Sequence, residues 1–266
     1  MIKDITIGQY YPADSILHRL DPRVKFVGTI MYLVSLFVAD SLLGYGLATA
    51  FLILMILLSK VPVSFMLKGL KPIFFILLIT VGFNLFFVPG EVLFRIGFLK
   101  ITDEGVFQAG KMGIRLIYLI IGSSVMTLTT TPNQLTDGLE SLMKPLKYIK
   151  VPVHEIAMMM SIALRFIPIL MEETDKIMKA QIARGADFES GNLLQKAKSL
   201  IPLLVPLFIS AFRRANDLAM AMEARCYHGG GGRTQMKPLC YHGRDWVTYG
   251  VLCMYLVMEI VIRVKL

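Results

Sequence analysis

Long apolar segments dominate the first half of the chain and return at its end. Five of them carry few charged side chains, at about 24–39, 42–58, 70–88, 112–130 and 246–264. A helix needs about 20 apolar residues to cross a bilayer, or somewhat fewer where the bilayer thins locally. The pattern therefore predicts five membrane-spanning helices, the first two of them joined by a short turn at Asp40 and Ser41.

The segment between the fourth and fifth apolar stretches is of a different kind. Residues 132–245 hold 15 Lys and Arg and 11 Asp and Glu among apolar patterns of helix length. The segment opens with Thr131-Pro132-Asn133-Gln134, which predicts a capping box with proline at the first helical position. Apolar residues then recur at helical spacing on one stripe of a short surface helix. They are Leu135, Leu139, Leu142, Met143 and Leu146.

Two longer helices are expected after this short one, at about 153–184 and 193–225. Each is apolar in its first half and charged in its second, and Pro168 is expected to kink the first of them. Gly185 and the glycines at 229–232 are natural stops. The pattern predicts a pair of amphipathic helices whose apolar halves lie under the membrane domain, although residues 151–171 could instead form a sixth span.

Composition agrees with a membrane protein. Hydrophobic residues make up 55% of the 266-residue chain and charged residues 18%, with a mean hydropathy of +0.63. The net charge of +9 does not indicate nucleic-acid binding, because basic residues collect in the cytoplasmic segments of membrane proteins. Cations precede the first span and fill the loop after the second, so we expect the N-terminus and the charged segment in the cytoplasm.

These patterns predict an all-α, polytopic integral membrane protein of the cell membrane with about five transmembrane helices. The predicted domains are a membrane domain of four helices at 1–130, a cytoplasmic domain of long amphipathic helices at 131–245 and a final transmembrane helix at 246–266. No removable signal peptide is evident at the N-terminus.

The sequence lacks the motifs of an enzyme. It has no phosphate-binding loop of the G-x-x-x-x-G-K-[ST] type, and the run from Gly229 to Thr234 lacks the lysine of such a loop. His154-Glu155 begins an H-E-x-x-H zinc pattern that fails at Met158. Three widely spaced cysteines define neither a disulfide framework nor a zinc ligand set. We therefore expect no catalytic residue, cofactor or metal in this chain.

One short pattern occurs twice, at the ends of the two long helices. The triplets are Ala183-Arg184-Gly185 and Ala224-Arg225-Cys226. A single arginine there has a simple explanation, since a cation stabilises the negative end of the helix dipole. Duplication favours a second role, because small neighbours leave the guanidinium bare enough to enter a groove on another protein. Two similar tips suggest two similar sockets.

With these residues in view, the chain resembles the energy-coupling factor (ECF) transporter transmembrane proteins, the T-components of modular vitamin and metal importers. "GQYYPADSILHRLDPRVKF", from Gly8 to Phe26, is similar to the opening of that family, and "AQIARGADF" and "AMEARCYHGG" are similar to its two coupling motifs. Two positions depart from the family pattern. Cys226 stands where glycine is usual, and Gly231 stands where an acid is expected.

The resemblance implies a coupling subunit without enzymatic activity. Each triplet would seat in a groove of one of two ABC-type ATPase subunits, which supply ATP hydrolysis. The long helices would relay ATP-driven closure to a separate substrate-binding membrane subunit, the S-component, that takes up a vitamin or other micronutrient. A self-sufficient secondary transporter or membrane enzyme is the alternative, and a membrane scaffold without transport is a third possibility. The transported compound, the identity of the ATPase pair and the role of 229–234 stay open.

Overall fold

A computed structural model describes residues 10–96, 99–186, 188, 192, 195, 198–229, 236 and 238–265, with the backbone alone for 92–96 and 99–100. Nearly all regular structure in these residues is helical, and the strands there are a single antiparallel pair, β1 (Val92–Ile96) and β2 (Leu99–Thr102). The predicted all-α class is confirmed. Part of the Gly229–Thr234 run and the first nine residues lie outside the described residues.

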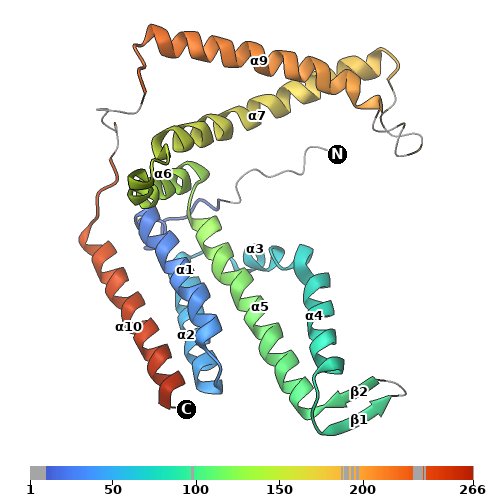
Figure 1. The fold of residues 1–266 in the computed structure, drawn as a ribbon, viewed down its shortest axis with the longest axis vertical. Helices are drawn as coiled ribbons and strands as arrows, with labels where there is room; N and C mark the ends of the chain where they lie inside the picture. Colours follow the sequence, from blue (N-terminus) through green and yellow to red (C-terminus); the bar gives the residue numbers. More distant parts are fainter. Residues whose placement is uncertain are drawn as a thin grey trace. The chain divides into compact units, whose positions relative to one another are not determined.

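The chain divides into two compact units, each with its own helices. The first, here called the bundle unit, comprises Ile7–Gly138 and Leu239–Leu266, and the second, the helix-pair unit, comprises Leu139–Pro238. The helices of the bundle unit are α1 (Pro22–Val38), α2 (Leu42–Ser59), α3 (Val63–Lys68), η1 (Lys71–Ile73), α4 (Phe74–Phe87), α5 (Asp103–Thr129) and α10 (Gly243–Lys265). The helix-pair unit holds η2 (Lys144–Ile149), α7 (Val153–Ala183) and α9 (Ile201–Ala224), and α6 (Pro132–Met143) spans the boundary (Figure 1).

Within the described residues, five helical segments are long and apolar enough to cross a membrane. They are Leu42–Ser59, Val63–Phe87, Asp103–Thr129, Val153–Ala183 and Gly243–Lys265. Four of them correspond to predicted spans, and the fifth, α7, contains the stretch that the sequence left open as a sixth span. The first predicted span forms α1, whose 17 residues lie at the lower limit for crossing a bilayer.

Two predicted spans differ from the structure in their boundaries. The third does not start as one helix at 70, because Gly69 and Pro72 interrupt the path between α3 and α4 with a short 3₁₀ turn. The fourth begins at Asp103 instead of 112, where the Thr102 hydroxyl accepts a hydrogen bond from the Gly105 amide at 3.1 Å. The extra turns carry charged residues, which an apolar pattern does not detect.

Aromatic packing forms the centre of the bundle unit. The rings of Phe51 on α2 and Tyr255 on α10 stack with centroids 4.2 Å apart, and Tyr32 on α1 stacks on Phe51. The Tyr255 hydroxyl lies 2.8 Å from the Ser35 hydroxyl. Gly122 lets α5 approach this cluster, because a Cβ there would lie 2.5 Å from the Tyr32 ring. The core thus joins four helices that are distant in sequence.

The distinctive opening of the chain is tied to the C-terminal end of α5. The amide of Tyr11 donates to the carbonyl of Leu128 at 2.9 Å. The carbonyl oxygen of Tyr11 lies within hydrogen-bond distance of His18 Nε2, at 2.9 Å. The other ring nitrogen, His18 Nδ1, is hydrogen-bonded to the Ser15 hydroxyl at 2.7 Å. Burial lowers the pKa of His18, which favours a neutral ring in this network. These bonds anchor the described part of the opening motif on the end of α5.

Asp21 and Asp245 lock the starts of α1 and α10 together. The Asp21 carboxylate caps α1 by accepting from the Arg23 amide at 2.9 Å and from the Arg23 guanidinium at 2.9 and 3.0 Å. The buried Asp245 carboxylate accepts from the Asp21 amide at 3.0 Å and from the His242 amide at 2.7 Å. Although burial raises the pKa of Asp21, the hydrogen bonds from Arg23 outweigh it and lower the pKa overall.

Candidate functional site: the tips of α7 and α9

The end of α7 is closed by two backbone hydrogen bonds. The Gly185 amide donates to the Ile182 carbonyl at 2.9 Å, and the Ala186 amide donates to the Gln181 carbonyl at 3.0 Å. Gly185 has φ 88°, in the left-handed region that glycine adopts without a steric penalty. These bonds make a Schellman motif, in which a left-handed residue after the cap turns the chain away from the helix.

The end of α9 repeats the same motif. The Cys226 amide donates to the Glu223 carbonyl at 2.8 Å, and the Tyr227 amide donates to the Met222 carbonyl at 3.1 Å. Cys226 has φ 54°, so it takes the left-handed position that Gly185 takes on α7. The resemblance between the two triplets is therefore structural as well as sequential, and the departure from glycine at Cys226 falls on a residue with a special backbone conformation.

The six predicted site residues occupy equivalent places on the two helices. Ala183 and Ala224 are the last helical residues, and Arg184 and Arg225 are the C-caps. All six residues of the two triplets are exposed. Within the part of the chain that the structure describes, neither guanidinium makes a hydrogen bond or an ion pair. Each helix therefore ends in an exposed five-donor fork whose donors stay available to a partner.

The arginine side chains do not cap their own helices in the described residues. The Schellman bonds already occupy the carbonyls of Gln181, Ile182, Met222 and Glu223. An arginine at a helix end that only stabilised its own helix would be expected to reach such carbonyls. The geometry thus favours the second of the two roles that the sequence left open.

α7 and α9 run in opposite directions where they touch. The Glu173 carboxylate pairs with the Arg214 guanidinium at 2.7 Å, and the Gln181 amide nitrogen donates to the Pro202 carbonyl at 3.2 Å. The end of α7 therefore lies beside the start of α9, and Figure 1 shows α9 continuing past this contact toward its own free end. The tips are held at opposite ends of the pair.

The distance between the tips follows from the length of α9. Arg225 lies 23 residues after Pro202, which contacts the last turns of α7. At 1.5 Å per residue this places the two arginines roughly 35 Å apart. Two tips this far apart cannot both enter one small groove.

The residues that hold the pair together were not singled out from the sequence. Pro206 offers a signal for one of them, because a proline has no amide hydrogen and leaves the carbonyl four residues earlier without its helical partner. That carbonyl belongs to Pro202, and it accepts a hydrogen bond from the Gln181 side chain instead. Glu173 pairs with Arg214 across the two helices. Such a contact needs the antiparallel register of the pair.

The predicted short helix and the two long ones are confirmed, with one boundary changed. The predicted capping box is present, since the Thr131 amide bonds the Gln134 side chain at 3.2 Å and the Gln134 amide bonds the Thr131 hydroxyl at 3.3 Å. The second long helix begins at Ile201 instead of 193, with Pro202 in its first turn. Some residues between 193 and 197 lie outside those that the structure describes.

Comparisons with known proteins agree on one family. Residues 13–238 match the family described as "Cobalt transport protein" (CbiQ). The chain is 60% identical to the "Energy-coupling factor transporter transmembrane protein EcfT" of Clostridium kluyveri, over 93% of this chain and 92% of the relative. It is 56% identical to the protein of the same name from Thermosediminibacter oceani, over 93% of this chain and 94% of the relative. It is 50% identical to that from Bacillus subtilis, over 92% of this chain and 93% of the relative. The chain belongs to the family of ECF transporter transmembrane components.

Proposed function

We propose that this chain is the coupling subunit of an ATP-driven importer. In this proposal Arg184 and Arg225 each enter a groove on one of two ABC-type ATPase subunits, and α7 and α9 carry the movement of those subunits to a separate substrate-binding membrane subunit. The transported compound is a vitamin or another micronutrient. The chain itself is not an enzyme in this account, and its partners hydrolyse the ATP.

The observation that carries the proposal is the repetition of one exposed tip at two distant points. Both tips end in the same Schellman motif, present one guanidinium and lie roughly 35 Å apart. A planar guanidinium can bind a carboxylate or two backbone carbonyls at once, which suits a socket on a partner protein. Two copies of one ATPase, or two related ATPases, would offer two such sockets.

The antiparallel contact supplies a means of transmission. The pair between Glu173 and Arg214 and the bond from Gln181 to the Pro202 carbonyl connect the two helices, so a displacement of one tip moves both. We place the N-terminus and residues 131–245 on the cytoplasmic side, where ATP is available, with 1–130 and 246–266 as the membrane domains. The charge bias of the flanking segments supports that orientation.

Charge reversal at the tips tests the proposal. Arg184→Glu and Arg225→Glu, singly and together, should weaken co-purification of the ATPase subunits and ATP-dependent uptake of the micronutrient. Loss of a buried arginine contact costs about 2 kcal/mol or more, which is about 30-fold in affinity. Arg213→Glu is the matched control, because Arg213 is exposed on α9 about three turns before its tip. Normal ATPase association and uptake in the double variant would refute the proposal.

A further inference from the structure

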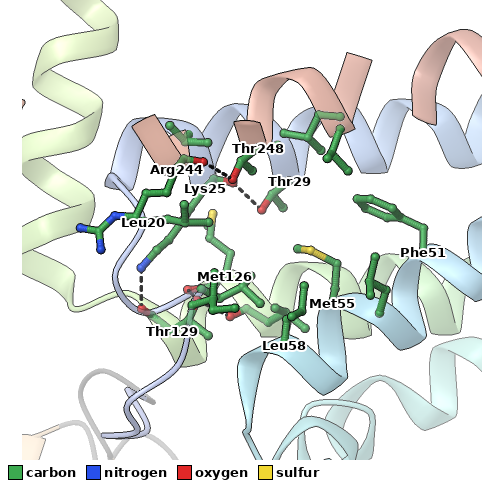
Figure 2. A pocket seen from close by; sticks show the side chains of 18 of the residues that line it. Leu20, Lys25, Thr29, Phe51, Met55, Leu58, Met126, Thr129, Arg244 and Thr248 are labelled. Atoms are coloured by element: carbon green, nitrogen blue, oxygen red, sulfur yellow. Dashed lines mark hydrogen bonds between the residues drawn. The ribbon is translucent and has the colours of Figure 1, made fainter. Parts of the chain in front are cut away.

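The bundle unit contains an apolar cavity of about 430 Å³ (Figure 2). Its walls come from α1, α2, α5 and α10, together with the segment before α1. Side chains such as Phe51, Met55 and Leu252 form the interior, while Leu54 and Val251 at its rim are about half exposed. The volume falls in the range of small-molecule sites, and the exposed rim gives a ligand a way in.

One end of the cavity is cationic. Lys25 and Arg244 line that end, whereas Phe51 and Met55 lie at the other (Figure 2). Among the described residues that line the cavity there is no carboxylate. The cavity therefore combines an apolar interior with two positive charges, a pattern complementary to an anionic amphiphile.

The Lys25 ammonium is buried and held in place. Its Nζ donates to the Thr129 carbonyl at 2.8 Å and to the His18 carbonyl at 3.2 Å. An ammonium has three donors, so one hydrogen is left for a ligand beyond these two bonds. In the described residues no carboxylate forms an ion pair with Lys25. The carboxylates of Asp21 and Asp245 attract the ammonium without forming an ion pair with it. Burial of the charge is still costly, and an anionic group at the cavity end would offset part of that cost.

A second hollow adjoins this cavity and extends the positive surface. It shares Ile16 and Leu58 with the first and is lined also by Arg19 and Lys60. Asp14 lies in the same hollow and pairs weakly with Arg19 at 3.5 Å. Arg244, Arg19 and Lys60 are cationic in addition to Lys25, and Asp14 is the single carboxylate among the described residues around the two hollows. This excess of positive charge suits a phosphate more than a neutral headgroup.

The cationic end of the cavity argues against an apolar helix of a partner protein as the occupant. An apolar helix offers no anionic group to Lys25 and Arg244, whereas an anionic phospholipid does. The acyl chain of such a lipid suits the apolar interior, and lipid surrounds every membrane-spanning protein.

We propose that the cavity binds one acyl chain of an anionic phospholipid, with the lipid phosphate at the end formed by Lys25 and Arg244. The chain replaces empty apolar volume, and the phosphate accepts hydrogen bonds from the two cations. The lipid then acts as a wedge that sets the spacing of α1, α2, α5 and α10. This inference is independent of the docking of the helix tips.

Photolabelling in proteoliposomes tests the proposal on the full-length chain. The probe is phosphatidylglycerol with a diazirine near the end of one acyl chain, and the comparison probe is phosphatidylcholine with the same acyl chain. We expect phosphatidylglycerol to label the peptide that carries Phe51 and Met55 at least fivefold more than phosphatidylcholine does. Equal labelling by the two probes, or labelling spread evenly over the lipid-exposed face of α4, would overturn the proposal.

Two pairs of variants on α10 sharpen the test. Arg244→Gln should reduce the preference for phosphatidylglycerol roughly fivefold, since each cation near the bilayer surface contributes about that factor, and Arg263→Gln near the other end of α10 should leave it unchanged. Val251→Trp should fill the cavity and abolish labelling of its interior, whereas Val257→Trp, away from the cavity, should not. Interior labelling that persists in Val251→Trp contradicts the proposal. Labelling that disappears once partner subunits are bound would also contradict it, because a protein would then be the occupant.

Discussion

Cys226 occupies a backbone conformation in which glycine should be more stable. Its φ is 54°, and the equivalent Gly185 on the other helix has φ 88°. A residue with a Cβ in the left-handed region costs roughly 1–2 kcal/mol of conformational free energy. Glycine avoids that cost, but ordering it costs roughly 0.5–1 kcal/mol more than ordering another residue, because glycine has more conformational freedom when the helix end is frayed. The difference predicts that Cys226→Gly stabilises the closed end of α9 by about 0.5–1 kcal/mol.

Hydrogen exchange can measure this change at the tip itself. The amides at 226 and 227 donate to the carbonyls of Glu223 and Met222, so they exchange when the end of α9 opens. A stabilisation of about 0.5–1 kcal/mol slows their exchange about two- to fivefold. Ala186, at the untouched end of α7, serves as an internal reference.

A conservative variant separates backbone strain from loss of the thiol. Cys226→Ser keeps the Cβ and should leave the exchange of these amides unchanged, because the strain comes from the Cβ. The mirror change, Gly185→Ala, should speed exchange at the end of α7 by a similar factor. Unchanged or faster exchange in Cys226→Gly would refute the argument that left-handed strain limits the stability of this tip.

Two further predictions concern ion pairs in the two units. A double-mutant cycle with Glu173→Gln and Arg214→Gln should give a coupling energy of about 0.5–1 kcal/mol, measured as hydrogen-exchange protection of α9. The coupling is modest because the two side chains are partly exposed, Glu173 at 27% and Arg214 at 39%. A coupling near zero would contradict a role of this ion pair in joining the helices. The lowered pKa of Asp21 means that its contribution to stability is complete above the pKa of the unfolded chain and is lost as the pH falls through the folded value. Asp21→Asn should therefore flatten the acid-side loss of thermal stability below about pH 4, and Asp14→Asn, at an exposed carboxylate, should not.

Local patterns in the sequence were enough to predict the helices and the left-handed ending of one of the two tips. Gly185 marks a left-handed stop directly, because glycine is the usual residue after a helix cap. Cys226 carries no such signal by itself, and only its likeness to the first triplet indicates the same ending. The break between α3 and α4 also lay in the sequence, at Gly69 and Pro72, but the apolar pattern outweighed it.

Contacts between distant segments could not be predicted in the same way. In the sequence, Lys25 is a cation at the start of a predicted span. In the structure its Nζ donates a hydrogen bond to the carbonyl of Thr129, 104 positions later. The contact depends on the packing of α1 against the end of α5, and so does the cavity beside it. The antiparallel register that brings Glu173 to Arg214 is likewise a property of the folded pair.

Photocrosslinking from the helix tips tests the proposed docking most directly. A photoreactive amino acid placed at Ala183 or Ala224, beside the arginines, leaves both guanidinium groups intact. In the assembled transporter, we predict that each position crosslinks to an ATPase subunit and that the two positions reach two different subunits. Crosslinks confined to this chain or to lipid would contradict the account.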